Sequence, residues 1–330
     1  MLSFGGPEGL DEVRPFLENV VRGRNVPPER LDEVEEHYKP FGGVSPINAR
    51  NRELIDAIRA RTDLPVYFGN RNWHPMVEDT VAEMTRDGVR RALVFATSAY
   101  GGYSACRQYN EDIARARAAV GDDAPQLVKL RHFHDHPAFI GANADAVRAA
   151  LSSLPAEVRD GARVVFTAHS IPVAAAETDG VPAEGNHRYS RQVAEAARLV
   201  AAELGLDEYE LVWQSRSGPP QVPWLTPEPE PTVEALAKAG VPAIVVAPIG
   251  FVSDHVEELR ELAEGLGLGF ARAATAGPDP RFADMVVELM AEHTSGASPR
   301  GLGDVPKAGC TVDGAPCAVD CCVPRPRPRR

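Results

Sequence analysis

Residues 241–264, VPAIVVAPIGFVSDHVEELRELAE, are predicted to form a buried strand, a short loop and a helix. The strand, residues 243–248, is apolar on both of its alternating faces. Strands of this kind lie in parallel sheets that are covered by helices on both sides. The loop carries the polar residues Ser253, Asp254 and His255. Because open α/β sheets bind ligands beyond the carboxyl ends of their strands, this loop is a candidate part of a ligand site.

The helix after this loop carries three carboxylates, Glu257, Glu261 and Glu264. Their spacings of four and three residues place them on one face of the helix. Like charges at this spacing disfavour an isolated helix, so solvent or a bound cation has to accommodate them. An acidic stripe by itself is more often a solvated helix face than a cation site.

The rest of the chain alternates strands with helices in the same way, which predicts a parallel, doubly wound α/β sheet. Further strands are predicted at residues 64–68, 92–96, 163–167 and 211–213. About four residues precede the first glycine loop, so the first strand is expected to be clipped.

Two segments recur about 150 residues apart: residues 87–107 resemble residues 238–258, and PVYFGNRNWHP resembles LVWQSRSGPP. Such self-similarity predicts two like-folded halves with a ligand cleft between them. We therefore expect an N-terminal domain over 1–140, a C-terminal domain over 141–296 and a cysteine-rich tail over 297–330.

The composition excludes several classes of function. The net charge of -12 argues against binding to nucleic acid. No apolar run approaches the roughly 20 residues that span a bilayer, and the N-terminus lacks the features of a signal peptide. We expect a monomeric cytoplasmic protein without stable membrane insertion. Neither half carries a glycine motif for a dinucleotide or a nucleoside triphosphate after its first strand.

His169 directly follows the strand predicted at 163–167 and its neighbour Ala168. It should therefore lie at the same sheet edge as the loop and the acidic helix. A histidine near carboxylates can bind a divalent cation or transfer protons near neutral pH. A histidine after a strand is, taken alone, more often a hydrogen-bonded structural residue.

Four motifs together resemble the ferrochelatase family: FTAHSIP at 166–172, IGFVSDHVE at 249–257, GGVSPIN at 42–48 and QSRSGPPQVPWL at 214–225. The resemblance runs in order from Leu2 to about residue 290, and the tail makes the chain similar to actinobacterial coproporphyrin ferrochelatases. It implies two Rossmann-like, chelatase-type domains with parallel sheets and a porphyrin cleft between them. The implied reaction inserts ferrous iron into coproporphyrin III and uses no nucleotide.

The resemblance also implies roles for individual residues. His169 and Glu257 match the catalytic pair on the metal side of the porphyrin. Three residues match positions that contact the porphyrin edge or its propionates: Ser45, Tyr109 and Tyr38. Glu261 and Glu264 match an acidic line that is interpreted in the family as a route for metal or protons. Phe4 stands where many coproporphyrin enzymes have a tyrosine that ligates iron, and a phenyl ring cannot do so.

These residue types suit metallation, which replaces two pyrrole N–H protons by a dication. An imidazole and a carboxylate can both accept protons and ligate ferrous iron. Three alternatives remain: a protoporphyrin IX ferrochelatase, a chelatase that inserts cobalt or nickel, and a tetrapyrrole carrier. The acidic stripe counts against the carrier, which has no need of one.

The tail carries Cys310, Cys317, Cys321 and Cys322, and Cys106 lies far upstream. Four thiolates suit zinc or an iron–sulfur cluster, and this spacing matches no standard motif for either. A tail without function is the third interpretation. The family resemblance favours a two-iron two-sulfur (2Fe-2S) cluster on Cys106, Cys317, Cys321 and Cys322, with Cys310 spare or replacing one of them.

Overall fold

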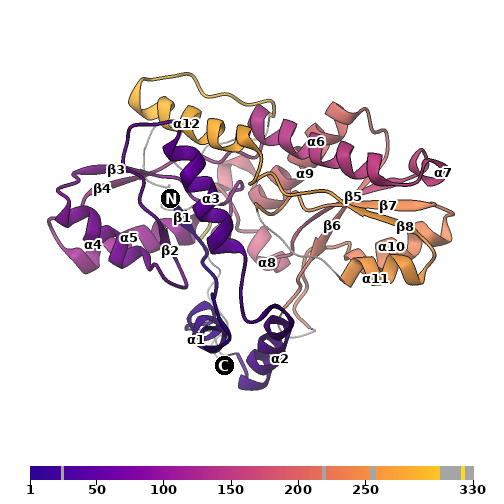
Figure 1. Cartoon of the computed structure of the whole chain (residues 1–330), viewed down its shortest axis with the longest axis horizontal. Helices are drawn as coiled ribbons and strands as arrows, with labels where there is room; N and C mark the ends of the chain where they lie inside the picture. The colour runs from indigo at the N-terminus through magenta and orange to yellow at the C-terminus, as the bar shows by residue number, and fades with distance from the viewer. Residues whose placement is uncertain (24–25, 218–220, 253–257, 305–320, 324–330) are drawn as a thin grey trace. The chain divides into compact units, whose positions relative to one another are not determined.

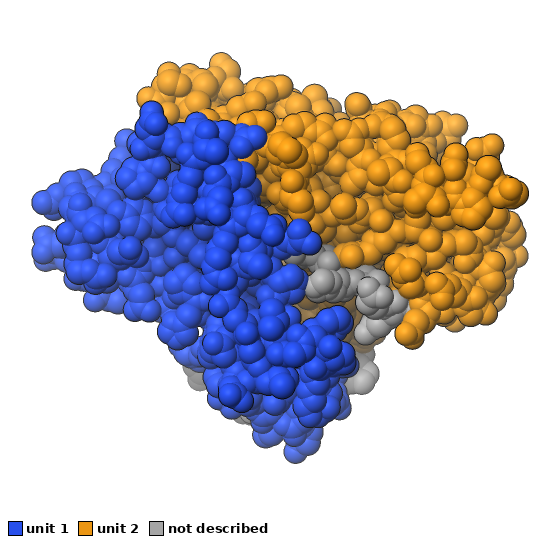
Figure 2. All heavy atoms as spheres, in the orientation of Figure 1, with its two compact units in different colours: residues 1–97, 108–130 blue, residues 98–107, 131–330 orange. Residues whose placement is uncertain are grey.

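The apolar strand predicted at 243–248 is present as β7 (Ala243–Ala247), and all five of its residues are buried. The structure, a computed structural model, describes residues 1–23, 26–217, 221–252, 258–304 and 321–323 (Figure 1). The chain forms two units, which Figure 2 shows in different colours. Unit 1 comprises Met1–Thr97 and Gln108–Leu130, and unit 2 comprises Ser98–Arg107 and Arg131–Arg330.

Unit 1 is built on four short parallel strands in the order β2-β1-β3-β4. β1 (Leu2–Ser3) pairs with β2 (Gly69–Asn70), and β3 (Arg91–Val94) pairs with β4 (Gln126–Lys129). A parallel bridge between Leu2 and Ala96 joins the two pairs. The helices are α1 (Leu10–Val20), α2 (Pro28–Tyr38), α3 (Ile47–Arg59), α4 (Val77–Arg86) and α5 (Gln108–Val120).

Unit 2 contains one parallel sheet in the order β6-β5-β7-β8. Its other strands are β5 (Arg163–His169), β6 (Tyr209–Gln214) and β8 (Gly269–Arg272). The helices are α6 (Pro137–Ser153), α7 (Ala156–Arg159), α8 (Val173–Ala176), α9 (Arg188–Leu204), α10 (Pro229–Lys238), α11 (Glu258–Gly265) and α12 (Pro280–Thr294).

Helices cover both faces of the sheet in unit 2, as the apolar strands require. On one face, Val165, Ile244 and Val246 pack with Val233 of α10 and Ala263 of α11. On the other face, α6 contacts β7 and β8, and α9 contacts β6 (Figure 1). Burying both faces of the strands explains why their sequences are nearly continuous apolar runs.

The two units share one strand order, and β3 and β7 occupy equivalent places in it. The predicted similarity of residues 87–107 and 238–258 therefore has a structural basis, and the α/β fold class is confirmed. The strand predicted at 64–68 is wrong in position. The observed strand, β2, comprises Gly69–Asn70, because it pairs only with the two residues of β1. Among the described residues, no helix is long and apolar enough to cross a membrane.

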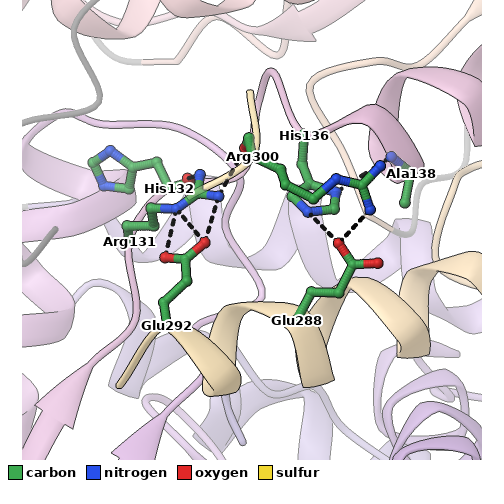
Figure 3. Close-up of polar contacts among 7 residues, drawn as sticks. All are labelled: Arg131, His132, His136, Ala138, Glu288, Glu292 and Arg300. Carbon is green, nitrogen blue, oxygen red and sulfur yellow. Dashed lines mark hydrogen bonds and ion pairs between the residues drawn. The ribbon is translucent and has the colours of Figure 1, made fainter. Parts of the chain in front are cut away.

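A buried polar cluster in unit 2 connects the segment RHFHDH, residues 131–136, with α12 (Figure 3). Arg131, whose side chain is fully buried, donates to both carboxylate oxygens of Glu292 at 2.8 Å. His136 Nε2 lies 3.2 Å from Glu288 Oε2, which is also 2.7 Å from Arg300 Nη1. The pairing matters because a buried charge without a partner is costly.

The same cluster anchors the segment that leads to the cysteine tail. Arg131 donates to the carbonyl oxygen of Arg300 at 2.8 Å. Leu302 N donates to Asp135 O at 3.0 Å, and Asp304 N donates to Glu195 Oε1 at 2.8 Å. Residues 300–304 are thus held on unit 2 by bonds to their backbone.

The buried His136 predicts a loss of stability in mild acid. Burial is the largest effect and lowers the pKa of His136 to about 4. The carboxylate of Glu288 raises this pKa, and the positive charges of Arg131 and Arg300 lower it. The unfolded chain then binds more protons than the folded chain between about pH 6.5 and pH 4, so stability falls as the pH falls through this window, by up to about 3 kcal/mol. Urea unfolding at pH 7 and pH 4.5 should show a shallower pH dependence for His136→Gln than for the wild type. Equal dependence in both would contradict this assignment.

Candidate functional site

His169 is the last residue of β5, and its side chain is exposed. Its Nδ1 lies 2.6 Å from the carbonyl oxygen of Ser170. Because a carbonyl oxygen only accepts, this bond requires the proton on Nδ1 and leaves the lone pair on Nε2. The exposed imidazole therefore presents a proton acceptor or metal ligand at the carboxyl edge of the sheet.

Two buried tyrosines hold the backbone at this edge. Tyr189 donates its hydroxyl to the carbonyl oxygen of His169 at 2.9 Å, and Tyr100 donates to that of Ile249 at 2.7 Å. Their rings meet edge to face, with centroids 6.0 Å apart. Burial raises the pKa of both hydroxyls, so they keep their protons and remain donors. The pair fixes the ends of two neighbouring strands, β5 and β7.

The backbone at Gly250 packs against the residues that directly precede His169. Gly250 N donates to Thr167 O at 3.0 Å, and a Cβ on Gly250 would lie 2.5 Å from the Cβ of Ala168. This close approach explains why residue 250 is a glycine, since any side chain would collide with Ala168. Glu257 itself lies outside the described residues, so its pairing with His169 stays a prediction.

Substituting Gly250 should damage activity through this contact. In Gly250→Ala, the new methyl group collides with the backbone and side chain of Ala168, which directly precedes His169, so the backbone here must shift. Because misplacing a functional group by about 1 Å can cost about 100-fold in rate, we expect the activity of this site to fall at least about 10-fold. Gly265→Ala is the matched control, since nothing lies within 4 Å of its Cβ. Equal rates in the two variants would argue against this role of Gly250.

Two of the motifs found in the sequence bond to each other. Leu225 N donates to Ile171 O at 3.0 Å, and Val173 N donates to Pro223 O at 2.9 Å. An antiparallel bridge links Pro172 with Trp224. The segment QVPWL therefore supports the backbone that follows His169.

The acidic residues of α11 that the structure describes face solvent. Glu261 and Glu264 are exposed, while Leu259 and Ala263 of the same helix are buried in the core. This arrangement fits a solvated helix face, and a role in a metal or proton route stays a prediction. Among the described residues there is no group of three or more His, Cys, Asp or Glu side chains that could hold a metal.

In unit 1, Ser45 and Tyr38 lie at the ends of one short loop. Tyr38 O accepts from Gly43 N at 2.9 Å, and Ser45 N donates to Pro7 O at 2.8 Å. A Cβ on Gly6 would lie 2.6 Å from the Cβ of Ser45, so the first glycine loop packs directly on this serine. Both candidates are half-buried.

Exposed apolar side chains lie in this loop and in the segment that packs on it. They come from the two segments that pack on each other, residues 4–10 and 41–44, which are linked by a bridge between Glu8 and Val44. Between 39% and 58% of each residue is exposed. This apolar patch consists of Phe4, Leu10, Phe41 and Val44.

Tyr109 is instead buried in the core of unit 1, at 4% exposure, with Leu2 and Ile113. The guanidinium of Arg71 lies 4.7 Å from its ring centroid and 2.5 Å from Asp112. Burial raises the pKa of its hydroxyl. The predicted porphyrin contact of Tyr109 remains untested by this arrangement.

Three of the five cysteines are described; all three are buried and none of them is in a disulfide. Cys106 lies in a π-helical turn, Tyr103–Arg107, and Cys321 and Cys322 have sulfur atoms 3.7 Å apart. Hydrogen bonding to Cys321 and burial raise the pKa of the Cys322 thiol. Cys310 and Cys317 lie outside the described residues.

Sequence reasoning did not identify Tyr100, Tyr189 or Gly250 as parts of this site. Gly250 stands directly after a buried strand, which marks it as a residue where the backbone turns or approaches closely. The hydroxyl bonds of the two tyrosines join residues 20 and 149 positions apart, and no local pattern reveals them.

Comparison with known proteins identifies the family. A family profile described as Ferrochelatase matches residues 1–294. The chain is 63% identical to the coproporphyrin III ferrochelatase of Nocardia farcinica, over 99% of this chain and 97% of that protein. It is 57% identical to the protein of the same name from Mycolicibacterium smegmatis, over 97% of each chain.

The structural comparison supports the fold alone, because the identities are low. SirB from Bacillus subtilis with Fe3+ matches with a TM-score of 0.56 and 14% identity, over 76% of this chain and 92% of that one. The cobalt complex of the sirohydrochlorin chelatase SirB from a Bacillus subtilis subspecies gives a TM-score of 0.53 at 15% identity, over 77% and 92%. The units of this chain have the chelatase-type, Rossmann-like architecture that the motifs implied. With a family match across nearly all of its length, this chain belongs to the ferrochelatase family.

Proposed function

We propose that this chain inserts ferrous iron into coproporphyrin III to give iron coproporphyrin, a step of haem synthesis. The observation that carries the proposal is the exposed imidazole of His169, whose Nδ1 bond to Ser170 leaves Nε2 as the acceptor. The names of the relatives at 63% and 57% identity specify the porphyrin and the metal.

In this proposal, Nε2 of His169 and the carboxylate of Glu257 first replace water ligands of ferrous iron and bring the ion to the ring. As the iron passes to the pyrrole nitrogens, each group is released from the metal and accepts one of the two pyrrole protons. Binding energy from the propionates would hold the macrocycle in a distorted form that tilts the nitrogen lone pairs toward the metal. The tyrosine bonds to His169 and Ile249 keep the backbone rigid while the ring is bound.

The apolar patch in unit 1 would receive the porphyrin. A macrocycle is flat and apolar at its centre and charged at its propionates, so it needs an apolar surface with polar groups beside it. Phe4, Leu10, Phe41 and Val44 supply the apolar surface, and Ser45 and the hydroxyl of Tyr38 supply polar groups. Phe4 contributes only its ring, which packs edge to face on Phe16.

We also propose that the cysteines hold the 2Fe-2S cluster implied by the resemblance. Thiolates are the ligands of such clusters, and the three cysteines described in unit 2 are buried and form no disulfide. Cys106, Cys321 and Cys322 would hold it with Cys317, which lies outside the described residues. Anaerobically purified protein should show visible cluster absorption, and zinc in its place would contradict this assignment.

Glu257→Gln separates an enzyme from a porphyrin carrier. The amide cannot accept the pyrrole protons or offer the iron a negative charge, so we expect turnover to fall at least about 100-fold while porphyrin affinity stays within about threefold. Iron insertion followed by the Soret shift gives the first quantity, and quenching of intrinsic fluorescence by porphyrin gives the second. If the wild type binds porphyrin but inserts no iron, the chain is a carrier or the chelatase of another metal.

A further inference from the structure

Residues 5–7 form the first glycine loop, which directly follows Phe4 of the apolar patch and packs on Ser45. Ser45 N donates to Pro7 O at 2.8 Å. A Cβ on Gly6 would lie 2.6 Å from the Cβ of Ser45, so the loop has no room to come closer. The position of this loop therefore sets the spacing between Phe4 and Ser45.

Two buried asparagines hold the loop in place. Asn48, the second residue of α3, donates through Nδ2 to Gly6 O at 3.0 Å. Asn70, the last residue of β2, donates through Nδ2 to Asn48 Oδ1 at 3.2 Å. His74 O accepts from the Nδ2 atoms of both asparagines, at 3.4 Å and 3.2 Å. Neither asparagine is exposed to solvent. This amide network ties the loop to a helix and a strand of unit 1.

The network needs a side chain at residue 48 that both donates and accepts. The nitrogen of Asn48 donates to Gly6 O, and its oxygen accepts from Asn70. A carboxylate of the same shape could not donate, and an apolar side chain could do neither. Because these groups are buried, water does not replace a lost bond, and an unpaired carbonyl group there is costly. Loss of the amide therefore favours movement of the loop.

Other contacts fix the loop on the same elements. Gly5 has a φ of 84°, which favours glycine, and a Cβ there would lie 2.9 Å from the Cβ of Asn70. Phe4 O accepts from Asn72 N at 3.1 Å and from Asn72 Nδ2 at 3.2 Å. The carbonyl oxygens of residues 4, 6 and 7 thus all accept hydrogen bonds from unit 1. The loop is preorganised as one fixed surface.

We propose that Asn48 and Asn70 are positioning residues for porphyrin binding. They hold Phe4 and Ser45 at the spacing that a flat macrocycle and its propionates require. The inference rests on the proposed function, in which the apolar patch receives the porphyrin, and extends it to two residues that are themselves buried. When the amide network is broken, porphyrin binding has to order the loop, which weakens binding. The chemistry at His169 should be unaffected, because that residue belongs to unit 2 and takes no part in the network.

The test is steady-state iron insertion by the full-length protein, with coproporphyrin III and ferrous iron varied separately. In Asn48→Ala, we expect the KM for porphyrin to rise at least about fivefold, while kcat and the KM for iron stay within about twofold. Loss of folded protein would instead lower kcat and leave both KM values unchanged, so the split is specific to a positioning role. A KM for porphyrin like that of the wild type, or an equal rise in both KM values, would overturn the inference.

Asn51→Ala is the matched control. Asn51 is a buried asparagine of the same helix, and its Nδ2 has no hydrogen-bond partner among the described residues. Its removal leaves a similar cavity without freeing the loop, so the KM for porphyrin should stay as in the wild type. A rise equal to that in Asn48→Ala would show that packing of α3 is responsible, and would overturn the inference.

Asn70→Ala provides a second test from the other end of the network. It keeps the Cβ that lies beside Gly5 and removes only the amide, so it should raise the same KM even if Asn48→Ala does not fold. An unchanged KM in this variant would also overturn the inference. A wild-type protein that binds no coproporphyrin III would defeat the proposed function itself, which is a different result from an active enzyme that tolerates both substitutions.

Discussion

His169→Ala should abolish iron insertion and leave porphyrin binding largely intact. The substitution removes the exposed imidazole at the carboxyl end of β5, and with it the Nε2 acceptor. General base catalysis contributes about 100-fold to 10,000-fold, and loss of a metal ligand adds to this. The side chain is exposed, so its removal leaves the core intact and the melting temperature should change by no more than about 2 °C. The Soret shift on metallation measures turnover, and fluorescence quenching measures porphyrin affinity.

His187→Asn is the matched control for this prediction. His187 is also an exposed histidine of unit 2, and asparagine tolerates its φ of 52°. We expect this variant to keep wild-type activity. If His169→Ala instead loses porphyrin binding or folding along with turnover, His169 has a structural role.

Glu292→Gln should be the most destabilising of the substitutions considered. It leaves the charge of Arg131 buried without its carboxylate, and breaking a buried ion pair from one side costs about 3–5 kcal/mol. The change also loosens α12 and the bond from Arg131 to Arg300. Urea unfolding monitored by circular dichroism gives the free energy.

Two further variants show whether the charge or the packing is responsible. Arg131→Met/Glu292→Leu removes both charges and should recover most of the loss, because hydrophobic replacement of a buried pair is often neutral. Arg148→Ala removes an ion pair with Asp145 whose side chains are 52% and 51% exposed, and should cost less than about 1 kcal/mol. A Glu292→Gln variant as stable as Arg148→Ala would show that the buried pair contributes little.

The main features of the fold were predictable because they follow from local patterns. The apolar run at 243–248 predicted a central strand. The internal similarity predicted two like-folded halves, and the two units share one strand order. The placement of His169 at a strand end followed from the same pattern. Each of these inferences depends only on patterns that can be read along the sequence, namely strand periodicity and internal repetition.

The polar interior of unit 2 was not predictable in this way. RHFHDH has the composition of an exposed loop, yet Arg131 and His136 are buried because their partners lie on α12. Arg131 and Glu292 are 161 residues apart, so nothing near either residue indicates the pair. Tyr109 illustrates the same limit, because Arg71, which lies over its buried ring, is distant from it in the sequence.

The most direct test of the proposed function is anaerobic insertion of ferrous iron, run in parallel on coproporphyrin III and protoporphyrin IX. The two porphyrins differ in two propionates versus two vinyl groups, so the comparison isolates recognition of those side chains. We expect the Soret shift of metallation with coproporphyrin III and at least about a 10-fold lower rate with protoporphyrin IX. Faster metallation of protoporphyrin IX, or tight binding of both porphyrins without metallation of either, would contradict the proposed function.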